Sequence, residues 1–217
     1  MSSQNIDTLA VNARVFFHLA GEACNEDSGG NASRTLVGVV FSAIAIESFV
    51  NEILERVGLS RPPDEDPRVS MLRTMSVACG LSGKSCSLET KVQVIYAALN
   101  GHAIDKGARP YQDFDLLLRV RNAIVHDRPE RIFTNYTGGR AGRPESIIAC
   151  LVAHRVIKQP DQSDVVFPAL NSLLEPSVAR FAFAAALSMA RMIASEFPGS
   201  WKQRLLIGFD LLDKYIV

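Results

Sequence analysis

The segment from residue 36 to residue 54, LVGVVFSAIAIESFVNEIL, restricts the fold more than any other part of the sequence. Its periodicity predicts a helix that Ser33 caps and that extends to about Val57. This helix is apolar over most of its circumference, and such helices are normally buried on all sides. We therefore expect it at the centre of the fold, with other elements packed around it.

A second apolar segment, SVARFAFAAALSMARMIASEF, follows Pro176, which suits the first turn of a helix. Its small side chains should allow the helix 176–197 to pack closely beside the first one. Asp7, Ser87 and Asp113 are the expected N-caps of three further helices. The remaining predicted helices cover residues 7–25, 68–79, 88–100, 113–126 and 145–154, with a short turn at 169–174 and a final helix that could form in the tail. The fold class expected from this order is an all-α, antiparallel helical bundle.

The domain organisation follows from length and composition. The 217 residues, of which 47% are hydrophobic, are enough for one large domain. We expect its core within residues 6–127 and 175–197. An irregular insert rich in Gly, Pro and Arg is predicted at about 128–170, and a C-terminal tail at 198–217.

Composition also limits the kinds of partner. Twenty-three basic and 23 acidic side chains give no net charge, which argues against bulk coating of nucleic acid or membrane. We find no apolar run of the roughly 18 to 20 residues that span a bilayer, and the polar first residues do not resemble a signal peptide. The expected location is the cytoplasm, without a membrane partner.

The four cysteines lack the spacings of zinc or redox sites, so no metal or other cofactor is predicted. We interpret them as ordinary buried thiols, the usual environment of free cysteine. They are Cys24, Cys79, Cys86 and Cys150.

Residues 113–130, DFDLLLRVRNAIVHDRPE, place polar side chains in an otherwise apolar helix. Arg121 falls on the apolar stripe, which predicts that it points at the core or along its rim. Because an unpaired buried arginine costs several kcal/mol, a carboxylate partner or a functional reason is expected. The stripe consists of Phe114, Leu117, Leu118, Arg121, Ile124 and Val125.

Asp115, Arg119, Asn122 and His126 follow one another at spacings of four, three and four residues. Side chains at these spacings stack along one edge of a helix. Arg121 and His126 should therefore border the same groove.

Glu47 is a charge within the apolar body of the 36–54 helix, on the stripe with Ala43, Val50 and Leu54. We therefore predict that Glu47 and Arg121 form an ion pair, because burying each charge separately would cost more free energy than burying the two together.

Between Arg119 and Arg143 the sequence has six arginines and two acidic residues. This local surplus suits a phosphate-bearing ligand, and we assign RNA binding to Arg128, Arg131, Arg140 and Arg143. An exposed loop that is merely rich in arginine would have the same composition.

The residues RNAIVH at 121–126, within the pattern F-x-x-L-x-x-x-R-N-x-x-V-H, resemble the R-x(4–6)-H motif of HEPN domains. The upstream AIESFVNEI and the downstream small-residue helix fit the same family. The resemblance implies an all-α bundle, usually a homodimer in which the motifs of both protomers face one cleft. Many members, toxin-like bacterial ones included, are metal-independent endoribonucleases of toxin–antitoxin or antiphage systems; others act as catalytically silent binding or scaffold modules.

On this resemblance Arg121, Asn122 and His126 match the motif positions, and Glu47 and Arg119 would support them. A histidine can exchange a proton near neutral pH, and an arginine can hold phosphoryl oxygens. Cleavage by 2′-hydroxyl attack would leave a 2′,3′-cyclic phosphate. The implied partners are RNA, a second copy of the chain and a nucleotidyltransferase-like antitoxin.

The alternative is a silent module in which Glu47 and Arg121 brace the bundle and His126 caps a helix end. The other histidines, His18, His102 and His154, are interpreted as structural or surface residues, with His154 placed to interact with carbonyls at a helix end.

Overall fold

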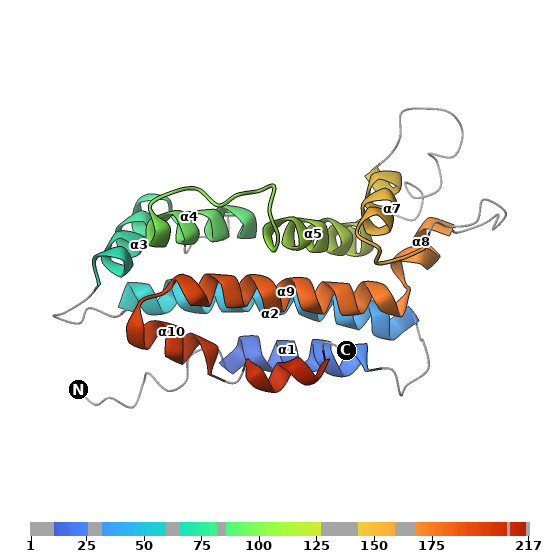
Figure 1. The fold of residues 1–217 in the computed structure, drawn as a ribbon, viewed down its shortest axis with the longest axis horizontal. Coiled ribbons are helices and arrows are strands. Elements are labelled where there is room, and N and C mark those ends of the chain that lie inside the picture. Colours follow the sequence, from blue (N-terminus) through green and yellow to red (C-terminus); the bar gives the residue numbers. More distant parts are fainter. Residues whose placement is uncertain are drawn as a thin grey trace.

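The computed structural model describes residues 11–25, 32–59, 66–81, 86–126, 143–158, 168–207 and 209–215. Every regular element in these ranges is a helix, which confirms the predicted all-α class (Figure 1). The helices are α1 Val11–Cys24, α2 Ala32–Leu59, α3 Pro67–Ala78, α4 Leu88–Asn100, α5 Tyr111–His126, α7 Arg143–Ala153, α8 Pro168–Leu173, α9 Pro176–Glu196, α10 Gly199–Leu206 and the 3-10 helix η4 Asp210–Tyr215.

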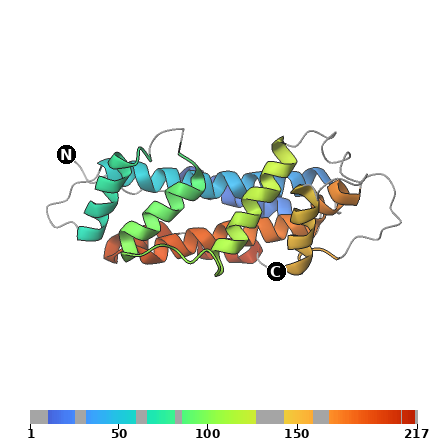
Figure 2. The ribbon, with the colours of Figure 1, turned by 90° about the horizontal axis from the view of Figure 1, so that it is seen from above.

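The long helices α2 and α9 lie side by side at the centre of the molecule (Figures 1 and 2). They run in the same direction. Helix α1 runs the opposite way on one side of them, and α5 crosses them obliquely on the other side (Figure 2). Close approach is possible because the facing residues are small. A Cβ on Gly38 would lie 2.9 Å from the Cβ of Ala179. The predicted central position of both segments is confirmed, but the central pair is parallel.

An aromatic cluster joins the centre to the layer of α1, α10 and η4. Phe17 of α1 packs edge-to-face against Phe183 of α9 and Phe209, at centroid distances of 6.3 and 5.6 Å. Phe49 of α2 contacts the same Phe209 ring at 5.6 Å. The segment predicted as a tail thus contributes to the core, where Leu205, Phe209, Leu212 and Tyr215 are all buried.

The opposite layer consists of α3, α4 and α5, with α7 beside α5 and α8 next to α7 (Figures 1 and 2). Helix α7 falls inside the range predicted as an irregular insert, at the place of the helix predicted for residues 145–154. Helix α8 begins in that range and ends at Leu173, where the short turn at 169–174 was predicted. The rest of that range, apart from residues 154–158, lies outside the described residues.

The first residues of the observed helices show which of the predicted N-caps are present. Ser87 caps α4, since its hydroxyl accepts a hydrogen bond from the Thr90 amide at 3.2 Å. Ser33 and Asp113 are not caps, because α2 starts at Ala32 and α5 at Tyr111. Asp66 is a cap that sequence analysis missed, accepting from the Arg68 amide at 2.9 Å. Asp7 lies outside the described residues.

Helices α2 and α9 contradict the sequence-based statement that no apolar run is long enough to span a bilayer. By length and hydropathy, α2 and α9 could each cross a membrane. However, 50% of the most apolar window of α2 and 61% of that of α9 are buried inside the fold. Both helices are therefore explained as core helices of this bundle.

Candidate nucleic-acid interface

The motif residues lie on the C-terminal half of α5. Its buried face consists of Tyr111, Phe114, Leu116, Leu117, Val120 and Ala123. Arg121 borders this face and is half-buried, in keeping with the predicted position along the rim. The predicted stripe is slightly rotated from the observed one, because Val125 is 47% exposed. Asn122 and His126 are exposed, so the end of α5 presents all three polar groups at the surface.

The three motif side chains contact one another. Arg121 Nη1 donates to Asn122 Oδ1 at 3.0 Å and approaches His126 Nε2 at 3.4 Å, a long contact. A guanidinium can only donate, so Nε2 is the acceptor, and the proton of the neutral ring is then on Nδ1. A guanidinium and an imidazole acceptor are therefore held together at one exposed point.

The predicted ion pair between Glu47 and Arg121 is wrong. Glu47 is exposed, and in the described chain no hydrogen bond or ion pair joins it to Arg121. The buried face of α2 passes instead through Ile46, Val50 and Ile53. Glu47 lies one residue outside that face, on the exposed edge that continues to Asn51 and Glu55. The rim position of Arg121 leaves its head group near the surface, so no buried carboxylate is required.

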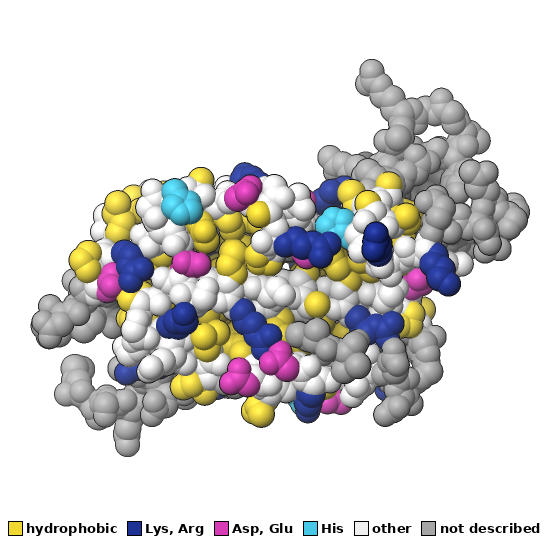
Figure 3. Space-filling view, viewed as in Figure 1, with side chains coloured by type: hydrophobic (Ala, Val, Ile, Leu, Met, Phe, Trp, Pro, Cys, Tyr) yellow, Lys and Arg dark blue, Asp and Glu magenta, His cyan; other side chains and the backbone are white. Residues whose placement is uncertain are grey.

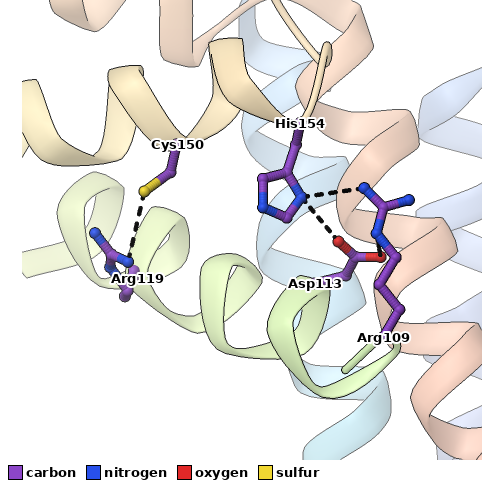
Figure 4. Close-up of polar contacts among 5 residues, drawn as sticks. All are labelled: Arg109, Asp113, Arg119, Cys150 and His154. Atoms are coloured by element: carbon purple, nitrogen blue, oxygen red, sulfur yellow. Dashed lines mark hydrogen bonds and ion pairs between the residues drawn. The ribbon is translucent and has the colours of Figure 1, made fainter. Parts of the chain in front are cut away.

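Arg119 connects the motif helix to α7. Its Nη1 lies 3.8 Å from Cys150 Sγ, which Figure 4 shows across the gap between the two helices. The same nitrogen is 4.0 Å from Asp115 Oδ2, one turn earlier on α5. Both side chains of this ion pair are about 40% exposed, so the pair adds little stability and both groups remain accessible to a ligand.

Asp113, His154 and Arg109 form a second polar cluster (Figure 4). His154 Nδ1 lies 3.0 Å from Asp113 Oδ1 and 3.4 Å from Arg109 Nη2. Arg109 Nε is 3.5 Å from the other carboxylate oxygen of Asp113. The sequence interpretation of His154 therefore needs correction, because its partner is this carboxylate. The spacing of Arg109 and Asp113 could have suggested their pairing, but nothing local indicates a histidine 41 residues away.

A pocket of about 440 Å³ lies along the same side of α5. We call it the α5 pocket. Its charged and reactive lining residues are Glu89, Lys106, Asp115, Arg119, Cys150 and His154. Figure 3 shows Lys, Arg and His side chains close together over this region of α5 and α7. The pocket can therefore offer both cations and carboxylates to a small polar ligand.

The other predicted RNA-binding residues are not placed by the structure. Arg128, Arg131 and Arg140 lie outside the described residues. Arg143 is the first residue of α7, and its side chain is likewise outside the description.

The remaining histidines and the cysteines occupy varied environments. His18 contacts the Tyr215 hydroxyl through Nδ1 at 2.9 Å, and His102 is exposed in a loop. The buried-thiol interpretation holds only for Cys24, whose pKa is raised to about 12 by burial. Cys79 is exposed, and the other two are half-buried. Among the described residues, no group of three or more His, Cys, Asp and Glu side chains could hold a metal ion.

Comparison of the chain with protein-family models, curated proteins and solved structures finds no match.

Proposed function

We propose that this chain is an endoribonuclease of the HEPN type, which cleaves RNA by attack of a 2′-hydroxyl and needs no metal ion. The observation that supports the proposal is the contact of Arg121 with both Asn122 and His126 at the exposed end of α5. The resemblance of these residues to the HEPN motif assigns them the catalytic positions.

In the proposed reaction, His126 accepts the proton of the 2′-hydroxyl as its oxygen attacks phosphorus. The new bond joins the 2′-oxygen to phosphorus, the bond from phosphorus to the 5′-oxygen breaks, and a proton is delivered to the departing 5′-oxygen. Arg121 stabilises the charge on the phosphoryl oxygens, and Asn122 orients the guanidinium. The products are a 2′,3′-cyclic phosphate and a 5′-hydroxyl.

The proposal includes an assembly and a setting. A homodimer would bring two copies of His126 to one phosphate, so that one accepts a proton while the other donates one. We place the protein in the cytoplasm, where a nucleotidyltransferase-like antitoxin would restrain it, as the resemblance implies.

The decisive experiment incubates single-stranded RNA in EDTA with the wild-type chain, His126→Ala and His102→Ala. His102 is an exposed histidine outside the motif, so its variant controls for loss of an imidazole. We expect wild type and His102→Ala to give cyclic-phosphate ends. For His126→Ala we expect cleavage at least about 100-fold slower, the usual contribution of proton transfer.

Absence of cleavage by the wild-type chain would count against catalysis and favour a silent binding module. Equal rates for wild type and His126→Ala would instead exclude this histidine as the acid or base.

A further inference from the structure

Helix α2 has an apolar stripe that the fold covers only in part. It consists of Val37, Val40, Phe41 and Ile44, whose spacings of three, one and three residues place them on one side of the helix. Val37 is 39% exposed and the other three are half-buried. In Figure 2, α2 lies along one long edge of the molecule, beside α9. The stripe can therefore contact another molecule.

Helix α1 widens this apolar surface. The rings of Phe16 and Phe41 pack against each other at a centroid distance of 5.9 Å, which joins the two helices. Val15 and Leu19 flank Phe16 on α1 and are 50% and 41% exposed. Contiguous apolar surface of this kind marks interaction sites on soluble proteins. We call it the α1–α2 face, formed by Val15, Phe16, Leu19, Val37, Val40, Phe41 and Ile44.

Opposite charges lie at the two ends of the stripe on α2. Arg34 precedes the first residue of the stripe by three positions, and Glu47 follows the last by three. The two charges are therefore about 20 Å apart along the helix axis. Both side chains are exposed, and within the described part of the chain neither forms a hydrogen bond or an ion pair. The single chain thus leaves an arginine and a glutamate without a partner beside an apolar surface.

A second copy of the chain matches this arrangement. A two-fold axis that passes between Val40 and Phe41 can pack two α2 helices antiparallel, so that the two apolar stripes cover each other. Arg34 of one protomer then lies at the same level as Glu47 of its partner, and symmetry repeats the contact at the other end. Parallel packing would instead place like charges opposite each other, which is unfavourable. The charges therefore favour one orientation of one partner.

We infer that the α1–α2 face is the interface of a homodimer in which the α2 helices pack antiparallel and Arg34 forms an ion pair with Glu47 of the other protomer. The inference rests on the proposed function for the role of this dimer, because it specifies the surface through which the second copy binds. The assembly itself does not depend on cleavage of RNA.

The test measures the dissociation constant of the full chain by sedimentation equilibrium. We expect the wild type to be a dimer, and Val37→Glu to raise the dissociation constant at least about 100-fold, because a carboxylate is then buried in the interface from both sides. Arg34→Glu and Glu47→Arg should each raise it at least about tenfold, since each reversal creates two like-charge contacts. Combining the two reversals restores opposite charges and should bring the constant back to within about threefold of wild type.

Two variants outside the α1–α2 face are matched controls. Met71→Glu places an acid at an apolar position of α3 that is 54% exposed, and Arg204→Glu reverses an exposed charge on α10. Both should dimerise like wild type. Circular dichroism melts establish that each variant is folded, and rescue by the double reversal separates loss of the ion pair from loss of the fold.

A monomeric wild type would overturn the inference. So would a dimer that Val37→Glu and both single reversals leave unchanged, or one that Met71→Glu weakens as strongly as Val37→Glu. If the dimer forms through the α1–α2 face but RNA stays intact, the nuclease proposal fails and the interface stands. If a monomeric chain cleaves RNA, the interface fails and the catalytic proposal stands.

Discussion

The hydroxyl group of Tyr215 donates a hydrogen bond of 2.5 Å to Glu22 Oε1, which joins the C-terminal helix η4 to α1. The same hydroxyl lies 2.9 Å from His18 Nδ1, so the imidazole must be the donor in that contact. The Tyr215 ring lies directly over Gly21, the glycine between these two partners in the sequence. Helix η4 is therefore fixed to α1 by one buried aromatic residue.

Gly21→Ala should destabilise the fold by about 1–3 kcal/mol, the usual cost of adding a methyl group to a packed site. A Cβ at this position would lie 2.3 Å from Tyr215 Cδ2, so the ring must move. Gly58→Ala is the control, because nothing lies within 4 Å of its Cβ and alanine favours helix. Urea denaturation followed by circular dichroism measures both, and equal stabilities would contradict the expected packing.

Tyr215→Phe should reduce the loss of stability in acid. The hydrogen bond from Tyr215 is the largest cause that lowers the pKa of Glu22, and the charges of His18 and Lys214 act in the same direction. A carboxyl group with a lowered folded-state pKa adds stability above its ordinary pKa, and this is lost as pH falls through the folded value. The unfolding free energy of the wild type should therefore fall more steeply below about pH 5 than that of Tyr215→Phe. Parallel pH profiles would refute this coupling.

Glu52 should act as a cap for α1. Its Oε1 accepts a hydrogen bond from the Ala13 amide at 3.2 Å, although the side chain belongs to α2. Burial raises the pKa of Glu52. The contribution of Glu52 to the free energy of unfolding is therefore largest at low pH and declines as pH rises through its pKa in the folded state. Glu52→Ala should cost about 1 kcal/mol by loss of the cap. Glu52→Gln keeps an acceptor without a buried charge, so at pH 7 it should be at least as stable as wild type in the same denaturation assay.

Arg121→Ala and Glu47→Ala should each change stability by less than about 1 kcal/mol. The reason is that Glu47 is exposed, and Arg121 forms its hydrogen bonds with exposed neighbours on its own helix. Phe114→Ala, which empties a fully buried site on the same helix, should cost about 3–5 kcal/mol and calibrates the assay. A loss of several kcal/mol in Arg121→Ala would restore a structural role for this arginine.

Sequence periodicity was sufficient to predict the helices and the central pair α2 and α9, because burial on all sides requires an apolar circumference. It was less reliable for single polar residues on those helices. Neighbouring residues of a helix point about 100° apart around its axis. The observed buried face of α2 is rotated slightly from the predicted one, so Glu47 lies on the exposed edge instead of the predicted core stripe.

The contacts that shape the α5 pocket could not be predicted from the sequence. Asp113 and His154 are separated by 41 residues, and Arg119 and Cys150 by 31. Such pairs depend on where α7 packs against α5. By contrast, the cluster of Arg121, Asn122 and His126 is local to one helix. Asn122 and His126 are four residues apart and share one edge, and the long side chain of Arg121 reaches both.

The α5 pocket and the motif share one helix, and this fixes their orientation relative to each other. No loop separates Arg119 from Asn122, so the angle between the two sites is set by the helical repeat itself. Each residue of a helix turns the chain by about 100°. One inserted residue between these positions would leave both groups of side chains intact but facing different directions around the helix axis.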